Sequence, residues 1–245
     1  PQNSSRSWGR QPTKSWSSTV RLSRPPVQVH IILLRRPADL ALYHACDVSA
    51  APPPGFGHLI LGGHNEAMHV DHLVFAAGPE GLRGTADRLS ATLGEESRDG
   101  GFHPRFGTRN RLIPLADDRY IEIVEVLEHP VADKAPFGQV VRARSEAGGG
   151  WLGWAISVDD LSGLEDRLDR KAVDGNRHFP DGRLLEWKQI GIRGTQADPQ
   201  LPFFIKWLSD ESVLPKALRG TVRLIKLEIA GDRGRLEEWL GCRAD

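Results

Sequence analysis

Cysteine is scarce in this chain, which has only two among its 245 residues. Cys46 and Cys242 stand far apart and form no CxxC pair, so a disulfide framework and a cysteine-rich zinc site are both excluded. Such cysteine usage suits a reducing compartment. We therefore expect a cytoplasmic location.

Long apolar runs and a net charge are also lacking. The stretch "VQVHIILL" stops at Arg35, well short of the roughly twenty residues that a membrane helix needs. Thirty-two basic residues balance thirty-two acidic ones, so no global field favours nucleic acid or an anionic membrane. The sequence predicts a partner that is neither nucleic acid nor membrane.

Several catalytic motifs are missing as well. The chain has no glycine-rich phosphate loop, no GxSxG elbow and no HExxH pair. We expect no nucleotide cofactor. A hydrophobic content of 39% is nevertheless sufficient for a sizeable core.

Residues 1–67 differ from the rest in composition. They are rich in Ser, Arg and Pro and lack an apolar period, so they bury too little apolar surface to offset the entropy of ordering. Our first hypothesis is that Met68, the only methionine, is the natural start and that residues 1–67 are a disordered or non-native extension. The alternative is a short strand at Val27 to Leu34 that docks on the domain.

From Met68 onward the chain repeats one plan of strand, helix and three strands. In the first copy, the strand "HVDHLVFAA" precedes Leu82, Ala86, Leu89 and Leu93, whose spacing of 4, 3 and 4 predicts an amphipathic helix ending at Gly94. The turn-rich "RDGGFHPRFGTRN" and the strands "RLIPLA" and "RYIEIVEV" follow.

The second copy begins at "LGWAISVDDL", where Asp159 or Asp160 can cap a helix carrying Leu161, Leu164 and Leu168. It continues with "VDGNRHF", "RLLEWKQIG" and "LPFFIKWL". The two modules cover about residues 68–130 and 151–210. Residues 220–245 resemble the start of a further strand and helix unit, which we expect to be truncated.

Alternation in the first strand raises the question of His72. Side chains of a strand point to opposite faces in turn, so Val70, His72 and Val74 share one face. Leu73 and Phe75 share the other face and are expected to pack under the helices, with Trp154, Ile156 and Val158 of the second copy. His69 and Asp71 are expected to be exposed ends of the strand or to be capped by a neighbouring turn. In "YIEIV" the same rule separates Glu122 from its neighbours Ile121 and Ile123.

The doubled plan, with His72 on the first strand and Glu122 on the last strand of the first copy, resembles the glyoxalase-like domain family of the vicinal oxygen chelate superfamily. "DHLVFAA", "FHPRFGTRN", "YIEI", "GWAISVDDL", "PDGRLLEW" and "LPFFIKW" match in the family's order. The resemblance implies one α+β domain over residues 68–230, in which paired βαβββ modules form a half-open barrel.

The resemblance also implies a divalent metal inside that barrel, with His72 and Glu122 as ligands. A histidine and a carboxylate suit Zn, Fe, Mn or Ni. The second module departs from the pattern, because Gly153 stands in the expected histidine position and its last strand offers only Ile205 and Lys206. The metal site is thus incomplete in sequence.

Four further residues are candidates. His103 and Glu186 are candidate extra ligands or catalytic groups that move a proton, and Asn110 and Trp154 are candidates for binding a substrate. Each has a plainer alternative: His103 on the surface, Glu186 in an exposed pair with Lys188, and Trp154 in the core.

Two functions remain open. In the first, a metal polarises a substrate with adjacent oxygens, in lyase, isomerase or dioxygenase chemistry. In the second, the protein binds or sequesters a small organic molecule without metal. The expected partner is that small molecule, with a homodimer as an alternative to a monomer.

Overall fold

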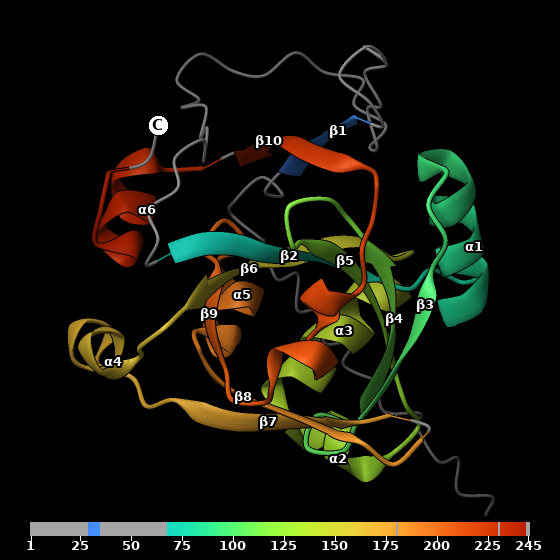
Figure 1. The fold of residues 1–245 in the computed structure, drawn as a ribbon. Coiled ribbons are helices and arrows are strands. Elements are labelled where there is room, and N and C mark those ends of the chain that lie inside the picture. The colour runs from blue at the N-terminus through green and yellow to red at the C-terminus, as the bar shows by residue number, and fades with distance from the viewer. Residues whose placement is uncertain (1–28, 35–67, 180, 230, 244–245) are drawn as a thin grey trace, which may run out of the picture.

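The computed structural model describes residues 29–34, 68–179, 181–229 and 231–243. Its centre is a closed barrel with the strand order β2-β5-β4-β3-β7-β8-β9-β6, and helices lie against it (Figure 1). The predicted α+β class is confirmed. Nothing in the described ranges forms a helix long and apolar enough to cross a membrane.

Each module follows the predicted plan. The first consists of β2 (Met68–Ala76), α1 (Gly81–Leu93), β3 (Arg98–His103), β4 (Thr108–Pro114) and β5 (Tyr120–Val126). The second consists of β6 (Gly150–Val158), α4 (Ser162–Leu168), β7 (Val173–His178), β8 (Leu184–Ile190) and β9 (Phe203–Trp207).

The helix ends show which local signals were reliable. Gly94 ends α1 in the left-handed conformation at φ 66°, as the sequence predicts. The predicted cap of α4 is wrong: its N-cap is Leu161, which offers no side-chain hydrogen bond, while the Asp160 carboxylate accepts from Ser162 instead.

Two junctions join the modules, and they are unequal. β2 and β6 pair antiparallel along almost their whole length, from Met68 opposite Val158 to Ala76 opposite Gly150. The other junction is a single pair, Phe102 of β3 opposite His178 of β7. We call this pair the seam. It completes the closed circuit where the sequence predicted a half-open barrel.

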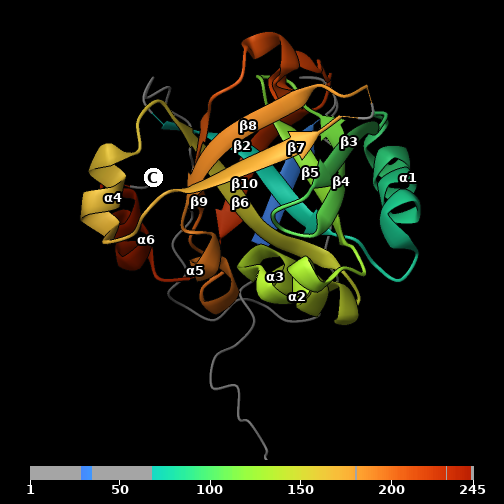
Figure 2. The ribbon, with the colours of Figure 1, turned by 90° about the horizontal axis from the view of Figure 1, so that it is seen from below.

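Three helices that the sequence did not predict lie across one end of the barrel. They are α2 (Pro130–Lys134), α3 (Pro136–Glu146) and α5 (Ile192–Ala197), seen together in Figure 2. α3 contacts α5, and both add apolar side chains to the barrel interior, including Phe137 and Ile192. This end of the barrel is therefore plugged.

The last strand and helix, β10 (Arg223–Ile229) and α6 (Arg233–Leu240), lie outside the barrel. β10 pairs antiparallel with β1 (Val29–Leu34), which falls within the range of the alternative strand at Val27 to Leu34. The other residues of the expected N-terminal extension, and Cys46 with them, lie outside the described residues. Cys242 is a free, exposed thiol.

Two apolar clusters separate the faces of the barrel. The outer cluster lies between the strands and α1, α4, α6 and β10, and it contains Leu73, Phe75, Trp154, Ile156 and Val158, as predicted. The inner cluster contains Val74, Ala76, Val124, Ala155, Leu185, Trp187, Phe203 and Ile205. Polar side chains that face inward are thus enclosed by apolar walls.

A bulge in β2 overturns part of the alternation argument. The register against β6 shifts between Val70 and His72, so Asp71 is an extra residue in the ladder. Val70 consequently packs in the outer cluster instead of sharing the face of His72. The expectation that Asp71 is exposed is also wrong, since it is 5% exposed.

The segment "FHPRFGTRN" is less of a loop than expected. His103 is the last residue of β3 and Asn110 lies within β4, and only a tight turn separates the two strands. The amides of Phe106 and Gly107 donate to the His103 carbonyl in this turn. Both candidate residues are therefore held by the sheet.

Candidate functional site

The barrel interior holds a cavity that opens to solvent, and the atom-free space in the cavity and its mouth together is about 430 Å³. Apolar walls with a few polar groups among them are typical of sites for small organic molecules. Its lining consists of His72, His103, Phe106, Asn110, Tyr120, Glu122, Phe137, Arg177, Leu185, Trp187, Gln189, Ile192, Phe203, Ile205 and Trp207.

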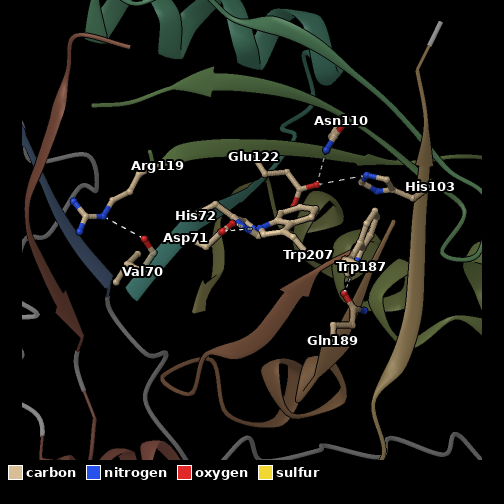
Figure 3. Close-up of polar contacts among 10 residues, drawn as sticks. All are labelled: Val70, Asp71, His72, His103, Asn110, Arg119, Glu122, Trp187, Gln189 and Trp207. Atoms are coloured by element: carbon tan, nitrogen blue, oxygen red, sulfur yellow. Dashed lines mark hydrogen bonds and ion pairs between the residues drawn. The ribbon is translucent and has the colours of Figure 1, made fainter. Parts of the chain in front are cut away.

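His72 is fixed from one side by its neighbour in the bulge. Its Nδ1 lies 2.6 Å from Asp71 Oδ1, while Asp71 Oδ2 accepts from Trp207 Nε1 at 2.9 Å (Figure 3). An ionised carboxylate only accepts, so His72 Nδ1 carries the proton. The ring stacks on Tyr120, with centroids 4.6 Å apart. His72 Nε2 is left to face Glu122 Oε2 at 3.8 Å.

Glu122 stands at the centre of the polar groups. It points into the barrel between the outward Ile121 and Ile123, as alternation predicts, and is 7% exposed. Asn110 Nδ2 donates to Glu122 Oε1 at 2.7 Å, and His103 Nε2 lies 3.9 Å from the same oxygen (Figure 3). The carboxylate thus receives one firm hydrogen bond and faces two imidazoles.

His103 is the second imidazole. Its Nδ1 lies 2.9 Å from Thr108 Oγ1, and its ring makes edge contacts with Phe106 and Trp187. Burial lowers the pKa of His103 to about 4; Glu122 opposes this shift, whereas Arg177 and His72 add to it. His103 is therefore neutral near pH 7.

Among the polar residues that line the cavity, sequence reasoning missed two. Arg177 on β7 and Gln189 on β8 are 3% and 4% exposed, and both line the cavity. Burial lowers the pKa of the Arg177 guanidinium from its ordinary value, and Tyr120 and Glu122 oppose that shift. Alternation could have found Gln189, because it shares a face of "RLLEWKQI" with the apolar Leu185 and Trp187.

Two candidates from the sequence do not reach the site. Glu186 is exposed on the outer face of β8, between the inward Leu185 and Trp187. Trp154 is 1% exposed in the outer cluster, where its Nε1 donates to the Gln200 carbonyl at 3.1 Å. A ladder residue next to an inward one must point outward. Trp154 thus lies in the core and Glu186 on the exposed face, as in the plainer alternatives, but Lys188, the expected partner of Glu186, lies 4.0 Å from Asp174 instead.

The resemblance implies a metal, and the donors fit it only in part. Each imidazole is held through Nδ1 and turns Nε2 toward Glu122, which is the orientation that metal-binding histidines adopt. Across the described residues, however, no group of three or more His, Cys, Asp or Glu side chains is arranged to hold an ion. The second module adds Ile205 and Trp207 to this region. The donors therefore fit the expected metal only in part.

The barrel of two βαβββ modules with a polar centre inside defines a protein of the glyoxalase-like α+β class. The sequence matches the glyoxalase-like domain family over residues 70–241. The chain belongs to this family. A search of curated proteins finds no match.

Solved structures with a similar fold include a hypothetical protein from Staphylococcus aureus, at 21% identity and a TM-score of 0.46. The match covers 62% of this chain and 63% of that one, which is less than two thirds of its length. A variant of methylmalonyl-CoA epimerase from Streptomyces coelicolor, in complex with 2-nitronate-propionyl-CoA, matches at 15% identity and a TM-score of 0.39 over 59% of this chain and 96% of that one. The methylmalonyl-CoA epimerase from Mycobacterium tuberculosis matches at 14% identity and a TM-score of 0.39, over 64% of this chain and 93% of that one.

Proposed function

We propose that this protein binds a small organic molecule in its barrel cavity, with His72, Glu122 and His103 as the polar centre that contacts it. The observation that carries the proposal is the convergence of these three buried groups inside apolar walls. Buried polar groups without full partners are costly, and a ligand that hydrogen-bonds to them removes part of that cost. Where binding leads to chemistry, the Glu122 carboxylate accepts a proton from the bound molecule and returns it to that molecule, beside the neutral His103.

A ligand-observed NMR screen of a fragment library tests binding. Leu185 lines the cavity, whereas its neighbour Leu184 is 40% exposed on the outer face. We expect fragments that bind the full chain to be lost in Leu185→Trp, because the indole fills the cavity, and to be kept in the matched control Leu184→Trp. Fragments that bind both variants equally would place the binding site elsewhere.

The second candidate is a metal-dependent function, which the orientation of the two imidazoles favours. His72 and Glu122 would hold a divalent ion with His103 as the third donor, and the ion would supply Lewis acidity. In the tautomer that carries its proton on Nδ1, His72 Nε2 would present a lone pair to the Glu122 carboxylate, 3.8 Å away. A cation between them relieves this repulsion.

Metal content separates the two candidates. If the second holds, elemental analysis of the purified full chain finds about one metal per chain, and Glu122→Gln or His72→Ala lowers this content at least about tenfold. Glu186→Gln is the matched control: it makes the same chemical change on the outer face, so metal content is expected to stay unchanged. A wild-type protein without stoichiometric metal would reject the metal candidate and leave the first proposal standing.

A further inference from the structure

Arg177 is a buried cation that no described carboxylate contacts directly, although Glu122 acts on its charge from a distance. It forms no ion pair or side-chain hydrogen bond with any part of the chain that the structure describes, and its Nε is buried without a partner. Its described contact is with the Phe179 ring, 4.4 Å from the guanidinium carbon. A buried charge without a counter-ion opposes folding. Such a residue points to a partner that comes from outside the chain.

The position of Arg177 places it beside the polar centre. Phe102 pairs with His178 in an antiparallel ladder, so the next residues, His103 and Arg177, lie opposite each other across the seam. Both face inward and both line the cavity. A group held by Arg177 would therefore lie next to His103 and within the electrostatic reach of Glu122.

The remaining lining shows what kind of molecule suits the cavity. Trp187, Phe106, Phe137 and Leu185 supply apolar walls for a carbon body. Gln189 Nε2 is a further buried donor without a partner. Trp187 Nε1 donates to the oxygen of the same amide, which fixes which end of the amide is the nitrogen. Arg177 Nε and Gln189 Nε2 are therefore two unsatisfied donors in the cavity, and acceptor oxygens on a ligand would satisfy them. A guanidinium is a planar fork that matches the two oxygens of a carboxylate.

We propose that the cavity takes an organic carboxylate, with Arg177 binding the carboxylate and the aromatic walls holding an apolar body. This inference rests on the proposed function, because it specifies the ligand of the same cavity. It assigns a role to the second module, which supplies anion recognition while the first module supplies the His72, Glu122 and His103 centre.

Acetate is the probe, because it presents the carboxylate alone and fits any cavity that admits a ligand. For a ligand present at about ten times its dissociation constant, the Tm of the full chain should rise by about 3 °C. Acetamide at the same concentration, and chloride at the same ionic strength, should not reproduce this rise. Inorganic phosphate is the fourth additive to be compared. Stabilisation by phosphate instead of acetate would overturn the carboxylate assignment.

Arg177→Met removes the charge and keeps a flexible, unbranched apolar side chain, although a shorter one. We expect the acetate effect to vanish, and the Tm without acetate to rise by roughly 2–5 °C, because the unpaired buried charge is gone. Arg119→Met is the matched control. Arg119 donates to the Val70 carbonyl at 3.2 Å and pairs with Asp117 at 3.7 Å, so its loss should lower the Tm and leave the acetate effect intact.

Arg177→Lys keeps the charge without the fork and is expected to weaken the acetate effect, which keeps the test decisive if Arg177→Met fails to fold. An acetate effect that is absent from the wild type, or that persists in both Arg177 variants, would overturn the inference. If fragment binding is lost in Leu185→Trp but the acetate effect is missing, only the carboxylate assignment is refuted. If the acetate effect is missing and fragments bind Leu185→Trp as well as Leu184→Trp, the proposed function is refuted too.

Discussion

Trp154→Ala is expected to lower the free energy of unfolding by about 3–5 kcal/mol, the cost typical of truncating a large buried aromatic. Trp154 packs in the outer cluster and is almost fully buried. Its loss leaves a cavity and also removes the hydrogen bond from Nε1 to the Gln200 carbonyl. Denaturation in urea at equilibrium measures the effect.

A second tryptophan provides the comparison. Trp187 lines the cavity, so Trp187→Ala enlarges a space that already exists and should abolish fragment binding. Trp154→Ala, in contrast, should leave fragment binding in the surviving folded protein unchanged. If Trp154→Ala proved neutral for stability and removed binding, the assignment of Trp154 to the core would be wrong.

The full chain, after treatment with a chelator, is expected to lose about 3 kcal/mol of stability through His103 alone as the pH falls from 7 to below 4. The pKa of His103 is about 4 in the folded protein against 6.5 for an ordinary histidine. Between pH 6.5 and about pH 4, His103 is protonated in the unfolded chain but not in the folded chain. Stability therefore falls as the pH falls through this range. A displacement of this size corresponds to about 3 kcal/mol.

The charged and titratable groups facing His103 are Glu122, Arg177 and His72, and they remain in His103→Gln. The fall in stability between pH 7 and pH 4 should therefore be smaller in this variant by about the same 3 kcal/mol. His69→Gln, at an exposed position of the same barrel, is the control and should follow the wild type. Parallel pH profiles for wild type and His103→Gln would refute the buried neutral imidazole.

Period-two patterns predicted most of the first module because its strands are regular. Ile121 and Ile123 mark one face of β5 as apolar, which left Glu122 to face the interior. The same reasoning failed at Asp71, because a bulge adds a residue that alternation cannot anticipate from one strand. The sequence therefore did not predict that the Asp71 carboxylate orients His72.

The second module was harder to interpret because its inward residues carry no uniform signal. On β7 the inward positions are Gly175 and Arg177, which do not form an apolar stripe. Gly175 is required there, since a Cβ would lie 2.2 Å from the Trp187 ring. Arg177 is inward only because β7 closes against β3, and that long-range pairing is not encoded in either strand alone.

The unequal junctions have a consequence for motion. The seam between β3 and β7 is one residue pair, whereas β2 and β6 are paired from end to end, so the barrel opens most easily at the seam. A ligand bound by Arg177 and the first module would contact both modules across the seam and so hold them together. Its binding free energy would then oppose local opening, and the backbone amides around Phe102 and His178 would exchange their hydrogens more slowly as the ligand concentration rises.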